Sequence, residues 1–279
     1  MEQASNARSA IATIVVVPCY NEASRLDLAA FDAFLARCAD VSLLFVDDGS
    51  TDDTPLIIER LRQRHPRRMV TLRLGTNVGK AEAVRRGMQL AIRRRASITG
   101  YWDADLATPL DAIARFRSVL EERPEVLLVM GSRVALLGRQ IRRRWRRHLL
   151  GRAFATAASF VLGLPVYDTQ CGAKLFRVTA ETAELFRQPF ETRWIFDVEI
   201  LARIVKSTSV VSERATVDAL YEYPLERWHE VNGSRLKSMD FLVAAFDLAS
   251  IYWRSRSTKT AVPPSIEHPA SSIQHRDAA

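Results

Sequence analysis

Short apolar runs rich in β-branched residues alternate with longer amphipathic segments through the first half of the chain. The apolar runs occupy residues 13–18, 42–47, 70–74, 98–103 and 126–132, and the segments with apolar residues three or four apart occupy 26–38, 54–64, 80–94 and 110–121. Strands that are apolar almost throughout and are joined by helices are typical of a parallel sheet covered on both faces. Residues up to about Arg133 are therefore predicted to form a Rossmann-like half, with a ligand at the carboxyl ends of its strands.

The second half of the chain has a less regular pattern. It predicts an arginine-rich helix from about Ile141 into the apolar run ending at Leu164, then a loop over 165–172, helices over 194–205 and 241–253, and a strand near 215–224. After Trp253 the composition turns to Ser, Thr, Pro and His, which predicts a disordered tail over 254–279. We therefore expect one domain over 1–253, with halves of 12–133 and 134–253.

Composition narrows the class of protein and of partner. The 279 residues are 48 % hydrophobic, which suffices for one large α/β domain. Lys and Arg outnumber Asp and Glu by 40 to 32, and the net charge of +8 favours an anionic partner such as a phosphorylated substrate, a lipid headgroup or a nucleic acid. Three unevenly spaced cysteines argue against a disulfide framework or a zinc site and for a reducing compartment.

Polar clusters follow four of the predicted strands, at residues 18–22, 46–54, 75–88 and 102–109. Because the carboxyl ends of parallel strands meet at one edge of a sheet, we expect these clusters to share a site. Asp52 or Asp53 is placed to cap the following helix. Capping leaves four further carboxylates unexplained, those of Asp47, Asp48, Asp103 and Asp105. These carboxylates would repel one another unless a cation or hydrogen-bond donors compensate their charge.

A divalent cation that binds a diphosphate would explain the spacing of Asp103 and Asp105. Alternate side chains of an extended segment point the same way, so both carboxylates can face one ion. Mg²⁺ is usually held by one or two carboxylates together with substrate phosphates. The loop before the third helix offers backbone N–H groups and the cations Lys80 or Arg85 to anionic oxygens. This loop lacks the Walker spacing, which excludes a P-loop ATPase.

Eight short motifs follow one another along the chain: "VVVPCYNE", "FVDDGSTDDT", "NVGKAEAVRRGM", "DADLATP", "GSR", "DTQCGAKLF", "RWIFDVEIL" and "WHEVNGSRL". Together they resemble the family 2 glycosyltransferases, and most closely the branch of dolichyl-phosphate β-glucosyltransferases. The resemblance covers about Ala12 to Trp253. It implies an α/β GT-A fold, a Rossmann-like nucleotide-sugar-binding fold with a largely parallel sheet flanked by helices, in which 12–133 binds the donor and 134–253 the acceptor.

The resemblance also implies roles for residues at matching positions. The nucleobase and ribose would be held by Pro18, Tyr20, Asn21, Glu22, Asp47 and Asp48. The donor site would be lined by Asn77, Gly79 and Lys80, Mg²⁺ or Mn²⁺ would be bound by Asp103 and Asp105, and Arg133 would approach phosphate. The sugar and acceptor side would be formed by Asp168, Thr169, Gln170, Cys171, Gly172, Arg193, Trp194, Asp197, Ser234 and Arg235, with Cys171 as a packing residue.

The sequence departs from the family pattern at two positions. Ala107 stands where related lipid-phosphate mannosyltransferases often carry a polar side chain, so Thr108 or water would complete the metal's ligand shell. Ala81 stands where the family commonly has glycine. The loop before the third predicted helix, which we call the donor loop, is therefore expected to sit slightly differently around the phosphates.

The resemblance implies inverting transfer of a hexose, with glucose from UDP-glucose the best match, to a polyprenyl phosphate. Such a phosphate has a second pKa of about 6, so it is already nucleophilic at neutral pH and needs cations rather than a base. Arg133, Arg193 and Arg235 are candidates for those cations. Asp197 would bind sugar hydroxyls or orient Arg193. The alternative within the family is a hydroxyl acceptor with Asp197 as general base.

A membrane surface is the further partner that the sequence suggests. No signal-peptide pattern opens the chain, and no apolar run reaches the ~18 to 20 residues that span a bilayer, so we expect a cytoplasmic protein, peripheral on the inner face of the membrane. If residues 139–152 are helical, Ile141, Trp145 and Leu149 share a face among arginines that could dock on anionic lipid. Packing of that face on the domain is the alternative. A nucleic-acid-binding protein would also use these arginines but leaves the carboxylates unexplained.

Overall fold

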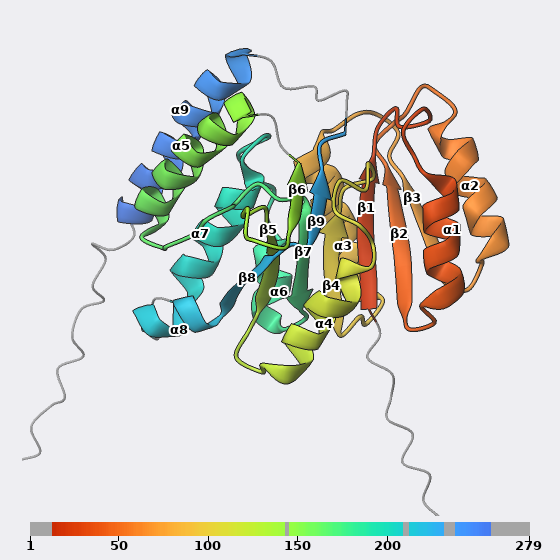
Figure 1. The fold of residues 1–279 in the computed structure, drawn as a ribbon, viewed down its shortest axis with the longest axis horizontal. Helices are drawn as coiled ribbons and strands as arrows, with labels where there is room; N and C mark the ends of the chain where they lie inside the picture. The colour runs from red at the N-terminus through yellow and green to blue at the C-terminus, as the bar shows by residue number, and fades with distance from the viewer. Residues whose placement is uncertain (1–12, 143–144, 209–211, 232–237, 258–279) are drawn as a thin grey trace, which may run out of the picture.

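The computed structural model describes residues 13–142, 145–208, 212–231 and 238–257 as a three-layer α/β domain (Figure 1). The central sheet has the strand order β3-β2-β1-β4-β7-β5-β8. Its strands are β1 (Thr13–Cys19), β2 (Val41–Asp47), β3 (Met69–Arg73), β4 (Ile98–Trp102), β5 (Leu128–Ser132), β7 (Ala173–Arg177) and β8 (Leu220–Pro224). A second, two-stranded sheet pairs β6 (Gln140–Arg142) with β9 (Arg227–His229). The predicted α/β class and largely parallel sheet are confirmed.

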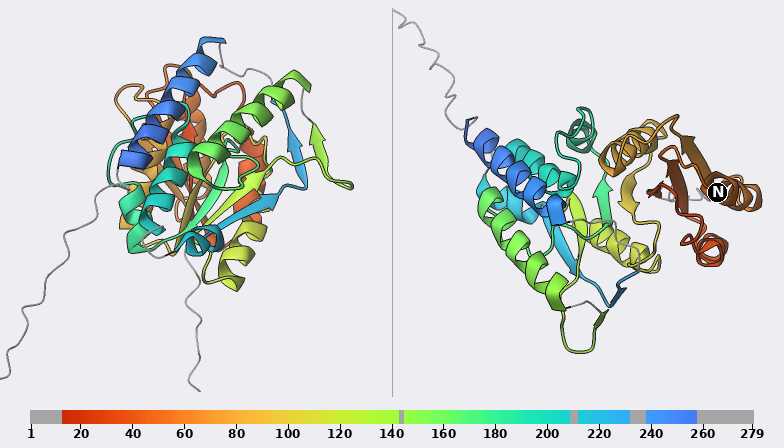
Figure 2. Two further views of the ribbon diagram at one scale, coloured as in Figure 1. Left: turned by 90° about the vertical axis from the view of Figure 1, so that its left-hand side faces the viewer. Right: turned by 90° about the horizontal axis from the view of Figure 1, so that it is seen from above.

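Helices cover both faces of the central sheet (Figure 2). One face carries α1 (Leu28–Arg37), α2 (Thr54–Arg64) and α4 (Ala112–Glu122). The other carries α3 (Lys80–Arg93), α5 (Trp145–Leu162), α6 (Ala180–Leu185), α7 (Phe196–Thr208) and α9 (Ser238–Ser257). The short helix α8 (Glu213–Asp218) leads into β8. Because both faces are covered, the strands are buried along nearly their whole length, as their continuous apolar runs require.

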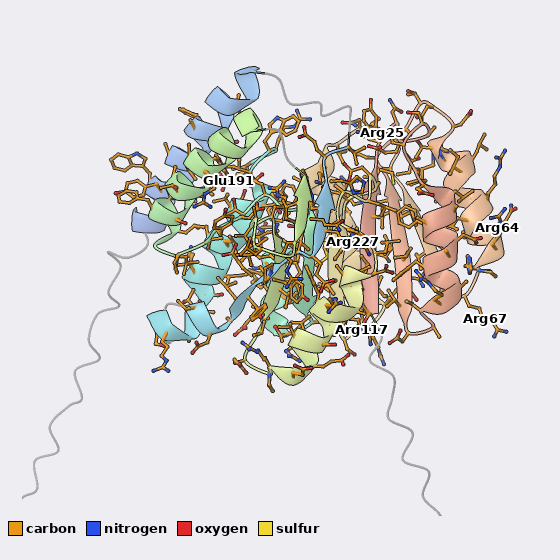
Figure 3. The ribbon with its side chains drawn as sticks, in the orientation of Figure 1. Arg25, Arg64, Arg67, Arg117, Glu191 and Arg227 are labelled. Atoms are coloured by element: carbon orange, nitrogen blue, oxygen red, sulfur yellow. The ribbon has the colours of Figure 1, made fainter. Side chains whose placement is uncertain are left out.

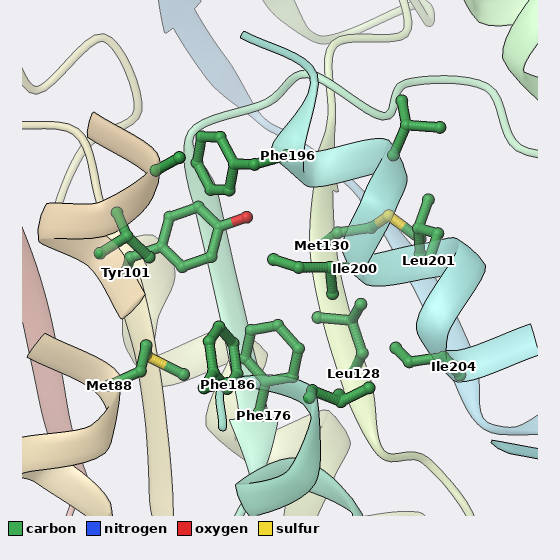
Figure 4. Close-up of a cluster of buried hydrophobic side chains, with 14 of the residues drawn as sticks. Met88, Tyr101, Leu128, Met130, Phe176, Phe186, Phe196, Ile200, Leu201 and Ile204 are labelled. Atoms are coloured by element: carbon green, nitrogen blue, oxygen red, sulfur yellow. The ribbon is translucent and has the colours of Figure 1, made fainter. Parts of the chain in front are cut away.

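The core on the α3 and α7 face surrounds the middle of the sheet (Figure 4). Met88 of α3, Phe176 of β7 and Ile200 of α7 are fully buried there. Tyr101 of β4 packs against Phe196 at the start of α7, with ring centroids 5.8 Å apart. This packing fixes α7 directly beside β4, the strand that leads into Asp103 and Asp105, which we call the Asp-x-Asp motif.

Strand β7 runs opposite to the other strands of the central sheet, which the sequence pattern did not predict. It runs antiparallel to both of its neighbours, β4 and β5. Its residue Lys174 is fully buried, so a charged residue interrupts the apolar run by which a buried strand is recognised. The antiparallel direction brings the residues before β7 to the carboxyl end of β4.

Three further predictions about the second half need correction. The arginine-rich helix does not begin at Ile141, because Ile141 pairs with Trp228 in the small sheet and α5 begins at Trp145. The residues before Leu220 form α8 rather than the start of a strand. The predicted tail over 254–279 starts too early, because α9 continues to Ser257, and 258–279 lie outside the described residues.

The helices α5 and α9 lie side by side on the outside of the domain, farthest from β3 (Figures 1 and 2). Phe160 of α5 stacks with Tyr252 of α9, with ring centroids 6.4 Å apart. Because both residues lie near the carboxyl ends of their helices, the two helices run in the same direction. In the part of the chain that the structure describes, no helix combines the length and apolar character needed to cross a bilayer.

Candidate active site

The loops after β1 and β2 are joined at the carboxyl edge of the sheet. The Asn21 amide donates to Ser50 Oγ (3.0 Å), and the Asn21 side-chain oxygen accepts from the Thr51 amide (2.8 Å). Asn21 has a left-handed backbone (φ 51°), which asparagine tolerates better than most residues. Glu22 pairs with Arg25, which Figure 3 shows at this edge of the sheet. The first two predicted clusters therefore lie together.

Asp47 and Asp48 hold the neighbouring loops in place. Asp47 Oδ1 accepts from the Ser50 amide (3.0 Å). The Asp48 carboxylate accepts from the amides of Val78 (2.8 Å) and Gly79 (2.9 Å). We expected the amides of this loop to face an anionic ligand, and for these two the expectation is wrong because Asp48 already accepts from them. Burial raises the pKa of Asp48, although the two N–H donors oppose the shift.

Lys80 is the cation of this loop that reaches the other carboxylates. It begins α3, and its Nζ lies 2.6 Å from Asp103 Oδ1. Arg85, the other predicted candidate, instead pairs with Glu82 and donates to the Arg187 carbonyl (3.1 Å). The prediction is therefore wrong for Arg85, whereas Lys80 connects the donor loop to the Asp-x-Asp motif.

The Asp-x-Asp motif follows β4 and is fixed by the loop before β7. The Asp103 amide donates to the Gly172 carbonyl (2.9 Å). A Cβ atom on residue 172 would stand 1.9 Å from Asp103 Oδ2, so glycine is required there. Asp105 Oδ1 accepts from the Ala107 amide (3.1 Å). Burial, and then the charge of Asp103, raises the pKa of Asp105, which indicates negative charge that the protein compensates incompletely.

Asp103 and Asp105 fit a divalent cation. A pair of carboxylates completed by phosphate oxygens and water is a usual arrangement for Mg²⁺. Among the residues that the structure describes, no group of three or more His, Cys, Asp or Glu is placed to hold a metal ion. Thr108, offered above as a ligand, instead places its buried hydroxyl 3.8 Å from Cys171 Sγ.

Asp197 lies in a buried network whose cation the sequence analysis missed. Its Oδ1 accepts from Lys174 Nζ (2.6 Å) and from the Tyr101 hydroxyl (2.5 Å). Lys174 Nζ also donates to the carbonyls of Thr169 (3.0 Å) and Cys171 (2.7 Å), so all three of its N–H groups are used. Burial, then the charge of Asp197, raises the pKa of Tyr101, which keeps its hydroxyl protonated and donating. The Lys174 ammonium group thus balances the negative charge of Asp197 inside the protein.

Arg133 and Asp168 form a two-point ion pair. The Nε–Oδ2 and Nη2–Oδ1 distances are 2.6 and 2.7 Å, and the guanidinium lies 5.3 Å from the centre of the Trp228 ring. Burial acts to lower the pKa of Arg133, but the pair with Asp168 outweighs it and raises the pKa. Glu222 accepts from the amides of Tyr167 and Asp168, both at 2.8 Å. Arg133 therefore anchors the start of the loop that precedes β7.

Arg193 and Trp194 lie on an exposed loop before α7. Glu199 accepts from the amides of Glu191 (3.0 Å) and Thr192 (3.1 Å) and so fixes the loop, whose start Figure 3 labels at Glu191. The Arg193 guanidinium lies beside Gly79, where a Cβ atom would be 3.4 Å from Nη2. No hydrogen bond or ion pair joins Arg193 to any other residue in the described part of the chain, including Asp197.

The other predicted residues divide into three groups. Gln170 is half-buried, and its backbone N–H donates to Asp168 Oδ1 (3.1 Å), while Asn77 is exposed on the donor loop. Pro18 is the penultimate residue of β1 and Tyr20 follows the strand. Ser234 and Arg235 lie outside the described residues.

Comparison with known proteins decides the family. The model of glycosyl transferase family 2 matches residues 14–182, which include all four polar clusters and the loop before β7. The chain belongs to this family. The glycosyltransferase interpretation is therefore confirmed, and it accounts for the carboxylates that nucleic-acid binding would leave unexplained.

Two sets of relatives extend this result. The glycosyltransferase is 31 % identical to a dolichyl-phosphate beta-glucosyltransferase of Trichomonas vaginalis, over 88 % of its own length and 73 % of the relative. It is 32 % identical to the enzyme of that name from Dictyostelium discoideum, over 80 % of its length and 68 % of the relative. Its fold matches glucosyl-3-phosphoglycerate synthase of Mycobacterium tuberculosis, in complex with Mn²⁺, UDP-glucose and phosphoglyceric acid, with a TM-score of 0.62, 17 % identity and coverage of 88 % and 80 %. The predicted GT-A fold is thus confirmed.

Proposed function

We propose that this glycosyltransferase transfers a hexose, with glucose from UDP-glucose as the best-supported donor, to a polyprenyl phosphate with inversion at the anomeric carbon. The observation that carries the proposal is the buried network of Asp197, Lys174 and Tyr101. Asp197 Oδ1 holds two donors, and a fully buried ammonium group balances the charge of the carboxylate. In this proposal Asp197 therefore has a structural role, and the acceptor is one that needs no general base.

A lipid phosphate is such an acceptor. Its second pKa is about 6, so most of it is a dianion at neutral pH and carries its own nucleophilic oxygen. It needs a cation that binds and orients it, and Arg193 is exposed, without a protein partner among the described residues, and beside the donor loop. In this proposal Arg193 and Trp194 contact the acceptor, and Gln170 with Ser234 and Arg235 completes its binding side. Arg133 pairs with Asp168, so its role in this proposal is to position the loop from Asp168 to Gly172.

The donor would lie along the carboxyl edge of β1, β2 and β4. The loops of Pro18, Tyr20, Asn21 and Glu22 and of Asp47 and Asp48 would hold the nucleoside, while Asn77, Gly79 and Lys80 would approach the diphosphate. Asp103 and Asp105 would hold Mg²⁺ or Mn²⁺, which when bound stabilises the charge of the departing nucleoside diphosphate. Lys80, already 2.6 Å from Asp103, adds positive charge at the same place. The names of the relatives, dolichyl-phosphate beta-glucosyltransferases, support glucose as the sugar and a polyprenyl phosphate as the acceptor.

The acceptor chemistry can be tested with Asp197→Asn. If the nucleophile is a phosphate dianion, this variant should keep measurable turnover at saturating substrate. Its rate should rise with pH through the acceptor's own second pKa, near about 6. Loss of all turnover with normal donor binding would favour the alternative, a hydroxyl acceptor with Asp197 as general base.

The proposed acceptor also implies a location. A polyprenyl phosphate keeps its tail in the bilayer, so we place the enzyme at the cytoplasmic face of a membrane as a peripheral protein. The positive net charge of +8 suits an anionic membrane surface.

A further inference from the structure

Lys174 holds the loop before β7 by its backbone. The Lys174 ammonium group donates to the carbonyls of Thr169 (3.0 Å) and Cys171 (2.7 Å), and both of these residues are buried. Buried carbonyl groups need a hydrogen-bond donor, and the fully buried lysine serves two of them at once. The two bonds therefore favour one conformation of the loop, in which both carbonyls point toward the ammonium group.

The end of this loop meets the Asp-x-Asp motif. Strands β4 and β7 pair Tyr101 with Lys174, and the pairing continues beyond the strands, where the Asp103 amide donates to the Gly172 carbonyl (2.9 Å). Gly172 also lies against the Asp103 carboxylate, since a Cβ atom on residue 172 would be 1.9 Å from Oδ2. The position of Gly172 therefore determines where the Asp103 carboxylate can lie.

Charge compensation accounts for only one of the three hydrogen bonds of Lys174. That bond joins Lys174 Nζ to Asp197 Oδ1 (2.6 Å), and the other two go to the loop. A buried ion pair is weak evidence for a role in stability, because well-packed apolar side chains of similar volume are often as stable. The two bonds to the loop thus point to a role that an apolar residue at this position would not fill.

We infer that Lys174 is a positioning residue, which fixes the loop before β7 and so sets the Asp103 carboxylate for the divalent cation. The choice of a cation as the ligand rests on the proposed function, whereas the contact between the loop and Asp103 does not depend on it. Lys174 acts through Gly172 and Asp103. Replacing a residue that orients a metal ligand typically changes metal affinity by about 10- to 100-fold.

Hydrogen–deuterium exchange of the full chain, read by mass spectrometry, tests this role without any ligand. Lys174→Met should speed exchange in peptides that contain Asp103 and the loop before β7, because the loop loses two hydrogen bonds that anchor it. The matched control is Arg177→Met, which removes a cation from the other end of β7. There Arg177 donates to the carbonyls of Val126 (3.3 Å) and Arg123 (3.0 Å), so this variant should leave exchange around Asp103 as in wild type.

Calorimetric titration with UDP in the presence of Mn²⁺ tests the consequence for the site. Lys174→Met should bind UDP with Mn²⁺ about tenfold more weakly than wild type or worse. The double variant Lys174→Met, Asp197→Asn separates positioning from charge compensation. Its melting temperature should recover in part, because no uncompensated carboxylate remains, whereas its affinity should stay low, because the loop still lacks its donor. Arg177→Met should melt earlier than wild type but bind UDP and Mn²⁺ equally well.

The two measurements give distinct outcomes for the two proposals. Unchanged exchange around Asp103 in Lys174→Met would overturn the positioning role. An affinity of the double variant that returns together with its melting temperature would also overturn it, because Lys174 would then serve only to compensate Asp197. Absence of UDP and Mn²⁺ binding in wild type would count against the proposed function, and exchange would still decide the role of Lys174. Should Lys174→Met be too unstable to purify, the double variant provides both measurements.

Discussion

Replacing Lys174 with Met removes the cation of the buried network while keeping most of the side-chain volume. The Lys174 side chain is fully buried, and its ammonium group makes three hydrogen bonds, to Asp197 and to the carbonyls of Thr169 and Cys171. Removing one partner of a buried ion pair leaves the other charge uncompensated and typically costs about 3 to 5 kcal/mol. We expect the free energy of unfolding to fall by about that amount.

Urea denaturation followed by tryptophan fluorescence would measure the change. Arg187→Met provides a matched control, because Arg187 pairs with Glu184 on the surface and its loss should leave the free energy of unfolding nearly unchanged. Adding Asp197→Asn to Lys174→Met should recover part of the loss, because the uncompensated charge is then absent. A coupling energy above about 1 kcal/mol in this double-mutant cycle is expected.

A small effect of Lys174→Met would refute the reasoning. If the variant unfolds within experimental error of wild type, and the cycle shows no coupling, Asp197 is not neutralised by a buried ammonium group. The main argument against Asp197 as a general base would then be lost.

Three further predictions concern the site and its surroundings. Asp105→Asn should remove most turnover without changing the thermal melt, and EDTA should abolish wild-type activity until Mg²⁺ or Mn²⁺ is restored; full activity in both experiments would contradict a metal at this motif. Gly172→Ala should reduce turnover strongly because a Cβ atom would overlap Asp103, whereas Gly75→Ala, which has open space, should behave like wild type; equal activity of the two variants would contradict the close contact. Burial raises the pKa of Cys171 to about 11, so at pH 8 its thiol stays neutral, and iodoacetamide should label Cys171 only after unfolding; rapid labelling of the native protein, mapped by mass spectrometry, would contradict its burial.

The first half of the fold could be predicted because each element there follows from local periodicity. Apolar runs of five to seven residues became strands, and the stripe of Val84 and Met88 became the buried side of α3. The second half depends on contacts between distant residues. Ile141 forms a strand because Trp228 pairs with it, and no periodicity within 139–152 reveals that partner.

The candidate site shows the same limit. Asp103 and Asp105 could be singled out because two carboxylates stand together after a strand. The roles of Lys174 and Asp48 could not be read from the sequence, because a lysine in an apolar run and an aspartate in a turn have many ordinary explanations. Their functions depend on which atoms the fold brings within hydrogen-bond distance, namely Asp197 for Lys174 and the Val78 and Gly79 amides for Asp48.

Identification of the product tests the central claim most directly. The purified protein would be incubated with UDP-glucose, Mg²⁺ or Mn²⁺ and either undecaprenyl phosphate or the matched alcohol undecaprenol, and lipid products would be analysed by mass spectrometry. We expect a hexosyl-phosphate lipid with undecaprenyl phosphate and no product with the alcohol. Transfer to the alcohol, or to another hydroxyl acceptor in preference to the phosphate, would contradict it.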